Sequence, residues 1–211
     1  MNISSNADGI LIIEDVFTED ECERIILEFE KSPTRYVIQE SKVRMGISDK
    51  LWEYHWQDTL LELIQPRMES AISFWMDTLH HSCRQECWTN FGWYISKYDI
   101  GDSCRPHFDG LLSNTDGGVD YVALAGVSLS LRTLEDDGSL VFPNQQRSIE
   151  CRRGTAIFFP TTYTHPHEVA AVSSLRYVLL GWLYYGRSTG LPETLAPGRV
   201  FIKYPYLCFN S

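Results

Sequence analysis

The sequence predicts a mainly β fold: a double-stranded β-helix of jelly-roll or cupin-like form, supported by α-helices from the N-terminal part of the chain. Two observations lead to this prediction. From Trp88 onward, short runs of β-branched and aromatic residues alternate with Gly, Pro, Asp and Asn, which is typical of an all-β sandwich or barrel. Before Trp88, apolar residues recur at helical spacing instead.

Two helices and one strand are expected in the first part of the chain. Thr18 is followed three positions later by a glutamate, a capping pattern that predicts a helix through about Lys31. A second helical stretch is predicted over about 50–80, interrupted or restarted near Pro66, because proline lacks the N–H that a helix interior needs. A short apolar strand is expected at 10–13.

The second part of the chain is expected to form two packed sheets. Several of its runs are apolar on both faces, as in VALAGVSLSL, TAIFFP and YVLLGWLYY. Such runs are expected where a sheet packs against a second sheet on one face and against helices on the other. Strands are predicted near 90–98, 105–109, 122–132, 139–142, 155–159, 165–170 and 174–185.

Length and composition predict one folded domain over residues 1–211. The chain has 211 residues, of which 44% are hydrophobic, and no repeat or linker divides it. Within this domain we expect helical support and a lid region over 1–87, the double-sheet core over 88–185 and a C-terminal tail over 186–211.

The charge pattern argues against a nucleic-acid partner. Acidic residues outnumber basic ones by 28 to 18, for a net charge of −10, and no run of Lys or Arg could neutralise neighbouring phosphates. No signal peptide or membrane span is visible, which predicts a cytoplasmic protein without a membrane partner. The six cysteines are thinly spread and are expected to be reduced thiols.

A metal site is predicted from the segment RPHFDG. His107 and Asp109 are two residues apart, so on a strand both side chains leave the same face and can share one metal. With one distant histidine they would complete the two-histidine, one-carboxylate set that suits Fe(II) and leaves open positions. An H-x-D pair alone is weak evidence for a metal site. The stronger evidence comes from the downstream segment THPHEVAAVSSLRYVLLGWLYY.

That downstream segment supplies a histidine and an arginine. His167 follows Asp109 by 58 residues, and Arg176 follows nine residues later on a strand face it shares with Val178, Leu180 and other apolar side chains. A buried guanidinium needs an anion, and a carboxylate fits it in bidentate fashion. The alternative is an internal salt bridge to an acidic residue of the chain.

The chain resembles the 2-oxoglutarate- and Fe(II)-dependent dioxygenases, in particular their prolyl 4-hydroxylase-like branch, in four successive segments: YDIGDSCRPHFDG, DGSLVFP, RRGTAIFFP and HEVAAVSSLRYVLLGW. The N-terminal segment IIEDVFTEDECERII is also similar to that branch. The resemblance implies that His107, Asp109 and His167 bind iron and that Arg176 pairs with the distal carboxylate of 2-oxoglutarate. The implied reaction consumes O₂ and 2-oxoglutarate, releases succinate and CO₂, and hydroxylates an unactivated C–H bond, with ascorbate as a reductant.

Three positions near this constellation have open roles. Tyr98 falls where the family often has a tyrosine near the co-substrate, and it fits a core aromatic residue equally well. His165 shares strand parity with His167, but His167 precedes Glu-Val as in the family, which leaves His165 as a neighbour of the ligands or of the channel. The group His80, His81, Cys83 and Cys87 lacks the spacing of a familiar zinc site.

The substrate is left open by the sequence. A compact chain without a peptide-binding module favours a small molecule or a free amino acid, and peptidyl proline is the alternative. A metal-dependent cupin without an oxo-acid co-substrate and a non-catalytic binding domain are the other hypotheses. The loops at 33–49 and 110–121 are expected to determine the choice of substrate.

Overall fold

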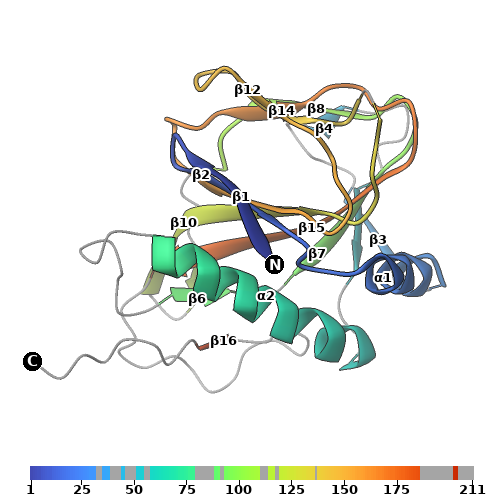
Figure 1. The fold of residues 1–211 in the computed structure, drawn as a ribbon, viewed down its shortest axis with the longest axis horizontal. Helices are drawn as coiled ribbons and strands as arrows, with labels where there is room; N and C mark the ends of the chain where they lie inside the picture. The colour runs from blue at the N-terminus through green and yellow to red at the C-terminus, as the bar shows by residue number, and fades with distance from the viewer. Residues whose placement is uncertain are drawn as a thin grey trace, which may run out of the picture.

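The computed structural model describes residues 1–31, 35–38, 44–45, 51–54, 58–78, 88–90, 93–109, 114–116, 119–135, 137–185 and 202–203. They form three layers (Figure 1): a smaller sheet, a larger sheet beneath it, and two helices, α1 (Glu19–Lys31) and α2 (Asp58–Thr78), on the far face of the larger sheet. The predicted mainly β fold with two packed sheets and N-terminal helices is thereby confirmed.

Among the described residues the larger sheet has nine strands, and its neighbouring strands are antiparallel. Its order is β1 (Asn2–Ala7), β2 (Ile10–Glu14), β13 (Ala156–Pro160), β10 (Val119–Ser130), β15 (Arg176–Tyr185), β6 (Trp88–Asn90) and β16 (Ile202–Lys203), with β7 (Tyr94–Tyr98) paired to β15 and β9 (Asn114–Asp116) paired to β10. The two strands at the N-terminus, β1 and β2, therefore belong to the same sheet as β15.

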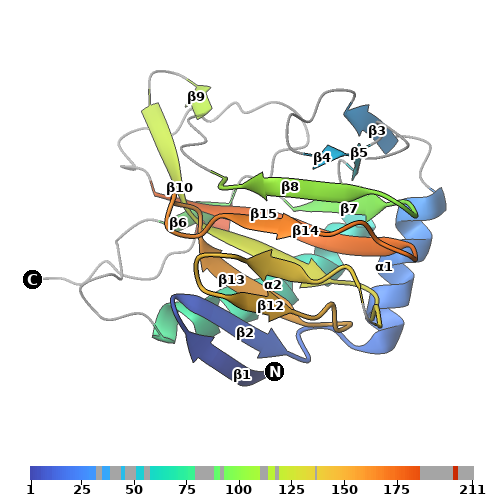
Figure 2. The same cartoon turned by 90° about the horizontal axis from the view of Figure 1, so that it is seen from above.

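The smaller sheet has five strands and lies over the larger one (Figure 2). Its order is β12 (Arg147–Ile149), β11 (Leu140–Phe142), β14 (His167–Val169), β8 (Ser103–His107) and β4 (Arg44–Met45). A separate pair is formed by β3 (Arg35–Ile38) and β5 (Leu51–Tyr54).

Two hydrophobic cores separate the three layers, and β15 contributes to both. Tyr177, Leu179 and Leu183 face the core between the larger sheet and the helices, whereas Val178 faces the core between the two sheets. Side chains alternate along a strand, so Arg176 lies on the same face as Val178. The predicted two-sided burial of this strand is correct.

Helix α1 begins with the predicted capping box. The backbone N–H of Thr18 donates to Glu21 Oε2 at 2.8 Å, and the N–H of Glu21 donates to Thr18 Oγ1 at 3.3 Å. These two bonds satisfy donors that the first helical turn leaves unpaired. Arg67 of α2 donates to the other oxygen of Glu21 at 2.7 Å, so the cap also joins the two helices.

The prediction of a helix over 50–80 is wrong at its start and at Pro66. Residues Leu51–Tyr54 form strand β5, because pairing with β3 outweighs the local helical periodicity. Helix α2 begins at Asp58 and continues through Pro66. Its apolar face, which includes Trp75 stacked on Phe158 of β13 at 5.8 Å between ring centroids, holds the helix on the sheet despite the missing N–H.

Several strand predictions need correction. The expected strand 90–98 is two strands, β6 and β7, and the polar strands β1 and β12 were not foreseen because neither has an apolar alternation. The predicted loop 33–49 lies largely outside the described residues, apart from β3 and β4, and about half of 110–121 is described, as β9 and the start of β10.

The cysteines of the described residues are free thiols. Cys22, Cys104 and Cys151 are buried and unpaired with one another, as expected for reduced cysteines. The remaining cysteines and the histidines of the HHSCRQEC segment lie outside the described residues. Neither α1 nor α2 is long and apolar enough to cross a membrane.

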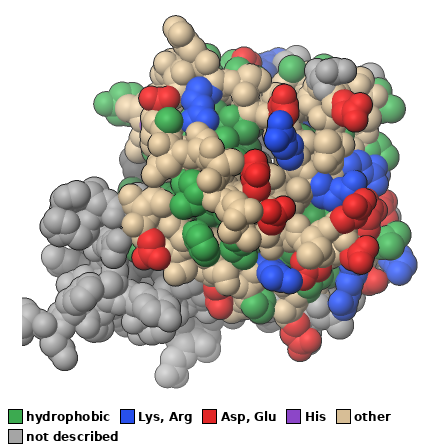
Figure 3. Space-filling view, viewed as in Figure 1, with side chains coloured by type: hydrophobic (Ala, Val, Ile, Leu, Met, Phe, Trp, Pro, Cys, Tyr) green, Lys and Arg blue, Asp and Glu red, His purple; other side chains and the backbone are tan. Residues whose placement is uncertain are grey.

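Acidic and basic side chains are interspersed on the face of the molecule that Figure 3 shows. The described residues also form exposed salt bridges, for example between Arg152 and Glu150 at 3.0 Å. Exposed pairs of this kind contribute little to stability, because water and salt screen them.

Candidate active site

Two of the predicted metal ligands face each other across the smaller sheet. His107 ends β8 and His167 begins β14, and the antiparallel pairing of these strands places the two residues in register. Their ring centroids are 4.4 Å apart. Two imidazoles that lie 60 residues apart in the sequence are therefore neighbours because two short strands pair.

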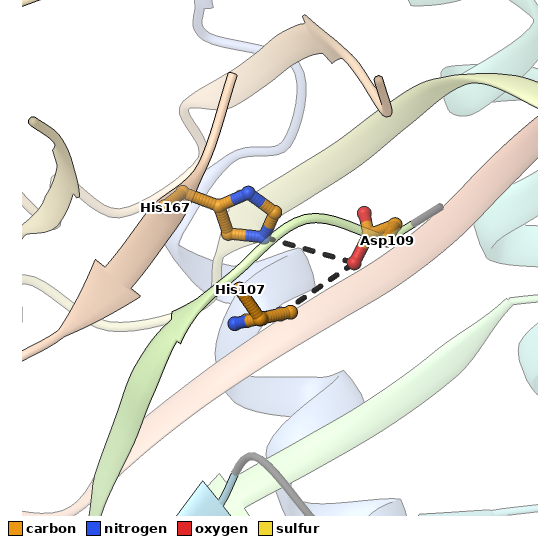
Figure 4. Close-up of side chains that lie close together, drawn as sticks. All are labelled: His107, Asp109 and His167. Atoms are coloured by element: carbon orange, nitrogen blue, oxygen red, sulfur yellow. Dashed lines mark ion pairs between the residues drawn. The ribbon is translucent and has the colours of Figure 1, made fainter. Parts of the chain in front are cut away.

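Asp109 completes the group from beyond the end of β8. Its Oδ1 lies 3.5 Å from His107 Nε2 and 3.7 Å from His167 Nε2 (Figure 4). Each of the three residues offers one ligand atom within 4.8 Å of the others, and no other such group occurs among the described residues. The predicted strand 105–109 ends at His107, so strand alternation alone does not explain why Asp109 turns inward.

The two imidazole rings are held with the same nitrogen facing Asp109. Nδ1 of His107 lies 2.8 Å from the carbonyl oxygen of Arg105, and Nδ1 of His167 lies 3.2 Å from that of His165. A carbonyl oxygen only accepts, so each Nδ1–H donates and each Nε2 is the ring nitrogen that faces the carboxylate. This is the arrangement that metal-binding histidines need.

The electrostatics of the group favour a bound cation. Burial alone would lower the pKa of His107. The Asp109 carboxylate and the neighbouring Cys104 outweigh this effect and raise the pKa to about 10. Burial lowers the pKa of His167. Burial raises the pKa of Asp109, yet contacts with His107, His167 and Trp182 bring it below its ordinary value, so the carboxylate is negatively charged at neutral pH.

The larger sheet supplies a floor beneath these three residues. Phe159, Gly126 and Trp182 form one row across β13, β10 and β15. The Phe159 ring packs on His167 at 4.7 Å between centroids. Trp182 Nε1 donates to Asp109 Oδ2 at 2.9 Å.

The sequence predictions missed the roles of these three floor residues. A signal was present for Trp182, which has the same strand parity as Arg176. For Gly126 and Phe159 no signal was available, because their position depends on the pairing of three strands.

Arg176 is buried between the sheets at 3% exposure. Its Nε donates to the carbonyl oxygen of Gly138 at 3.1 Å and lies 3.3 Å from the thiol of Cys151. Within the described part of the chain it forms no ion pair with a carboxylate, so the alternative of an internal salt bridge finds no support there. Its Nη groups are thus available to an anion from outside the chain.

Tyr98 lies directly beside Arg176. The two residues are partners in the pairing of β7 with β15, and the guanidinium carbon stands 4.7 Å from the centroid of the tyrosine ring. The ring is buried and supports the cation through its π face. Tyr98 therefore adjoins the predicted co-substrate anchor and is also part of the core between the sheets.

His165 lies outside the three-residue group. It precedes β14, and its Nε2 lies 2.7 Å from the carbonyl oxygen of Asp8, in the turn between β1 and β2. Its Nδ1 lies 2.8 Å from Thr164 Oγ1. The structure thus occupies both ring nitrogens of His165 with protein partners, which agrees with the preference for His167 as the ligand.

Comparison with known proteins places this site in a class. Residues 93–184 match the family model of the 2OG-Fe(II) oxygenase superfamily, and this stretch contains His107, Asp109, His167 and Arg176. The stretch of the chain that holds the metal-ligand group and Arg176 therefore matches the 2-oxoglutarate- and Fe(II)-dependent oxygenases. No curated protein sequence matches the chain significantly.

Solved structures with a similar fold include prolyl hydroxylases. The viral collagen prolyl hydroxylase of Paramecium Bursaria Chlorella virus-1 has a TM-score of 0.65 at 18% identity, covering 84% of this chain and 97% of that chain. A Trichoplax adhaerens prolyl hydroxylase, bound to a peptide fragment of the hypoxia inducible factor oxygen degradation domain, scores 0.65 at 19% identity over 85% and 84%. A Pseudomonas putida prolyl-4-hydroxylase scores 0.60 at 16% identity over 84% and 92%. At these identities the likeness is one of fold.

The residues present fit the cofactor and the co-substrate of this superfamily. Two imidazole nitrogens and one carboxylate oxygen are a donor set suited to Fe(II). The buried guanidinium of Arg176 suits the distal carboxylate of 2-oxoglutarate, which would supply the anion that the described protein residues do not. His107, Asp109 and His167 would hold the iron.

Proposed function

We propose that this oxygenase hydroxylates a proline residue within a peptide. The oxygenase chemistry rests on one observation above all, the convergence of His107, Asp109 and His167 in a site that also has a buried arginine without a carboxylate partner among the described residues. The peptide substrate is supported by the solved structures of similar fold, which are prolyl hydroxylases.

The size of the chain does not argue against a peptide substrate. Compactness favoured a small molecule in the sequence-based hypothesis. The viral collagen prolyl hydroxylase matches 84% of this chain with 97% of its own, so that enzyme is no larger than this one. A separate peptide-binding module is therefore unnecessary for a protein of this fold to have a peptidyl substrate.

Two exposed aromatic side chains support a substrate that approaches from outside. Phe108 lies between His107 and Asp109 in the sequence and is 52% exposed. Tyr163, four residues before His167, is 76% exposed. A peptide substrate could use each ring as a contact, because an aromatic ring offers a large apolar surface. Both lie on segments that lead directly to a metal ligand, where an incoming peptide would pass.

The chain's own residues would perform three tasks in the reaction. Iron and 2-oxoglutarate, when bound, would activate O₂, which is the oxidant for C–H hydroxylation. Arg176 orients the co-substrate through its distal carboxylate, and Tyr98 supports that guanidinium. The imidazoles of His107 and His167, each held by a backbone carbonyl oxygen, and the Asp109 carboxylate would hold three donor atoms on one side of the metal. The apolar core between the sheets would exclude water from the site.

The test is a substrate screen with purified protein, Fe(II), 2-oxoglutarate and ascorbate. Proline-containing peptides are compared with the same peptides carrying alanine in place of proline and with free amino acids, and the mass gain of one oxygen atom is measured. We expect the gain only in the proline-containing peptides. Oxidation of free amino acids with no peptide product would instead support the small-molecule hypothesis.

A further inference from the structure

The two oxygens of the Asp109 carboxylate have different surroundings. Oδ1 faces Nε2 of both histidines, at 3.5 and 3.7 Å. Oδ2 accepts a hydrogen bond from Trp182 Nε1 at 2.9 Å. The metal-facing oxygen and the oxygen held by the protein are therefore distinct atoms of one side chain.

We propose that Trp182 is a positioning residue that reserves Oδ2 of Asp109, so that the carboxylate presents Oδ1 alone to the metal. This inference rests on the proposed iron site. A carboxylate can bind a metal through one oxygen or both. A hydrogen bond from an N–H to a charged oxygen is stronger than one between neutral groups. Trp182 therefore opposes rotation of the carboxylate toward binding the metal through both oxygens.

Gly126 supports the same inference independently. A Cβ at this position would lie 3.1 Å from Asp109 Oδ2 and 2.8 Å from two carbons of the Phe159 ring. The φ angle of Gly126 is not in the left-handed region, so glycine is needed here for space. The backbone of β10 thus lies close to Oδ2, and a side chain at position 126 would press on both the Phe159 ring and the carboxylate.

The consequence concerns the co-substrate. In a two-histidine, one-carboxylate site the protein leaves open positions for the other ligands. A carboxylate that bound through both oxygens would take one of these positions. Trp182 and Gly126 would therefore act on 2-oxoglutarate affinity through Asp109, without touching the co-substrate themselves.

Trp182→Phe tests the proposal, because it removes the N–H and keeps an aromatic ring. The affinities of the protein for Mn(II), and of the Mn(II)-loaded protein for 2-oxoglutarate, are measured by calorimetry without O₂. We expect Mn(II) affinity to stay within about threefold and 2-oxoglutarate affinity to fall about tenfold or more, as loss of a hydrogen bond to a charged group implies. The absorption spectrum of the Co(II)-loaded variant should also differ from that of the wild type.

Trp93→Phe is the matched control. Trp93 is buried, and its Nε1 has no hydrogen-bond partner among the described residues, so the substitution removes an indole N–H without releasing Asp109. We expect lower thermal stability with unchanged 2-oxoglutarate affinity and an unchanged Co(II) spectrum. An equal loss of 2-oxoglutarate affinity in both variants would overturn the proposal.

Gly126→Ala provides a second route if Trp182→Phe does not fold. It should lower 2-oxoglutarate affinity while Mn(II) binding persists, because the added methyl group crowds Oδ2 as well as the Phe159 ring. If Trp182→Phe and Gly126→Ala both bind 2-oxoglutarate as tightly as the wild type, the proposed role of Oδ2 is refuted, and the proposed function is not. A wild-type protein that binds neither Mn(II) nor 2-oxoglutarate would instead refute the proposed function.

Discussion

Arg176 shows at the scale of one residue how much the sequence could predict. Its strand parity and its distance from His167 predicted a buried guanidinium, and the structure places it at 3% exposure. The partner of its Nε, the carbonyl oxygen of Gly138, could not be predicted, because a loop 38 residues away approaches it. Gly138 has φ +64°, and a side chain there would clash with Leu134.

Arg176→Leu should raise the 2-oxoglutarate requirement while metal binding is largely kept. The substitution removes the charge that would pair with the distal carboxylate, and loss of one partner of such a buried pair costs about 2–5 kcal/mol, or roughly 30-fold or more in affinity. Titration of the Mn(II)-loaded variant with 2-oxoglutarate measures this. An unchanged affinity would assign Arg176 to a structural role.

The two neighbouring histidines should differ in their effect on metal binding. His167→Ala removes a donor atom and should abolish tight Mn(II) binding, measured by calorimetry. His165→Ala removes the contact with the turn at Asp8 but no donor atom of the group, so binding should weaken by about tenfold at most. The reverse order of effects would exchange the roles of the two residues.

The elements were predicted best where one segment alone determines them. The capping box of α1 depends on Thr18 and Glu21 only, and it formed as predicted. Strand β1 depends on pairing with β2, and the start of α2 depends on the pairing of β5 with β3. Such long-range pairings leave little trace in local periodicity, which explains the errors at these places.

Glu21→Gln should make the stability of the fold depend less on pH. Burial raises the pKa of Glu21, but the Thr18 N–H and Arg67 lower it below its ordinary value. Its contribution is therefore fully present above the pKa of the unfolded chain and is lost as the pH falls through the folded pKa. At neutral pH we expect a loss of about 0.5 kcal/mol in the free energy of unfolding, because Gln can still accept from the Thr18 N–H and only the charge is lost; this loss should shrink toward acid.

Urea unfolding at a series of pH values measures this effect. Glu28→Gln is the control, because Glu28 is an exposed residue of the same helix that pairs with Lys31 at 3.3 Å, and such a pair contributes little. A cost for Glu21→Gln that stays constant with pH would exclude a role for the charged carboxylate in the cap.

At the scale of the whole molecule, both sheets contribute residues to the candidate active site. His107 and His167 come from the smaller sheet, while Trp182 and Arg176 come from the larger one. The sequence predicted the two sheets and the ligands, because each ligand has a local motif. It could not predict the floor of the site, because that depends on how one sheet lies on the other (Figure 2).

Ligands that bridge the two sheets should stabilise the folded chain. Mn(II) and 2-oxoglutarate at about 100 times their dissociation constants should each add about 2.7 kcal/mol, since neither site exists in the unfolded chain. Thermal unfolding with both ligands, with each alone and with EDTA measures this. A melting temperature that Mn(II) and 2-oxoglutarate leave unchanged would contradict a site built between the sheets.

The most direct test of the central claim is turnover of 2-oxoglutarate in isotopically labelled dioxygen. If His107, Asp109, His167 and Arg176 form an oxygenase site, succinate should gain one labelled oxygen atom in a reaction that requires Fe(II), and His107→Ala should abolish it. Unlabelled succinate, or label incorporated equally well by His107→Ala, would contradict the claim.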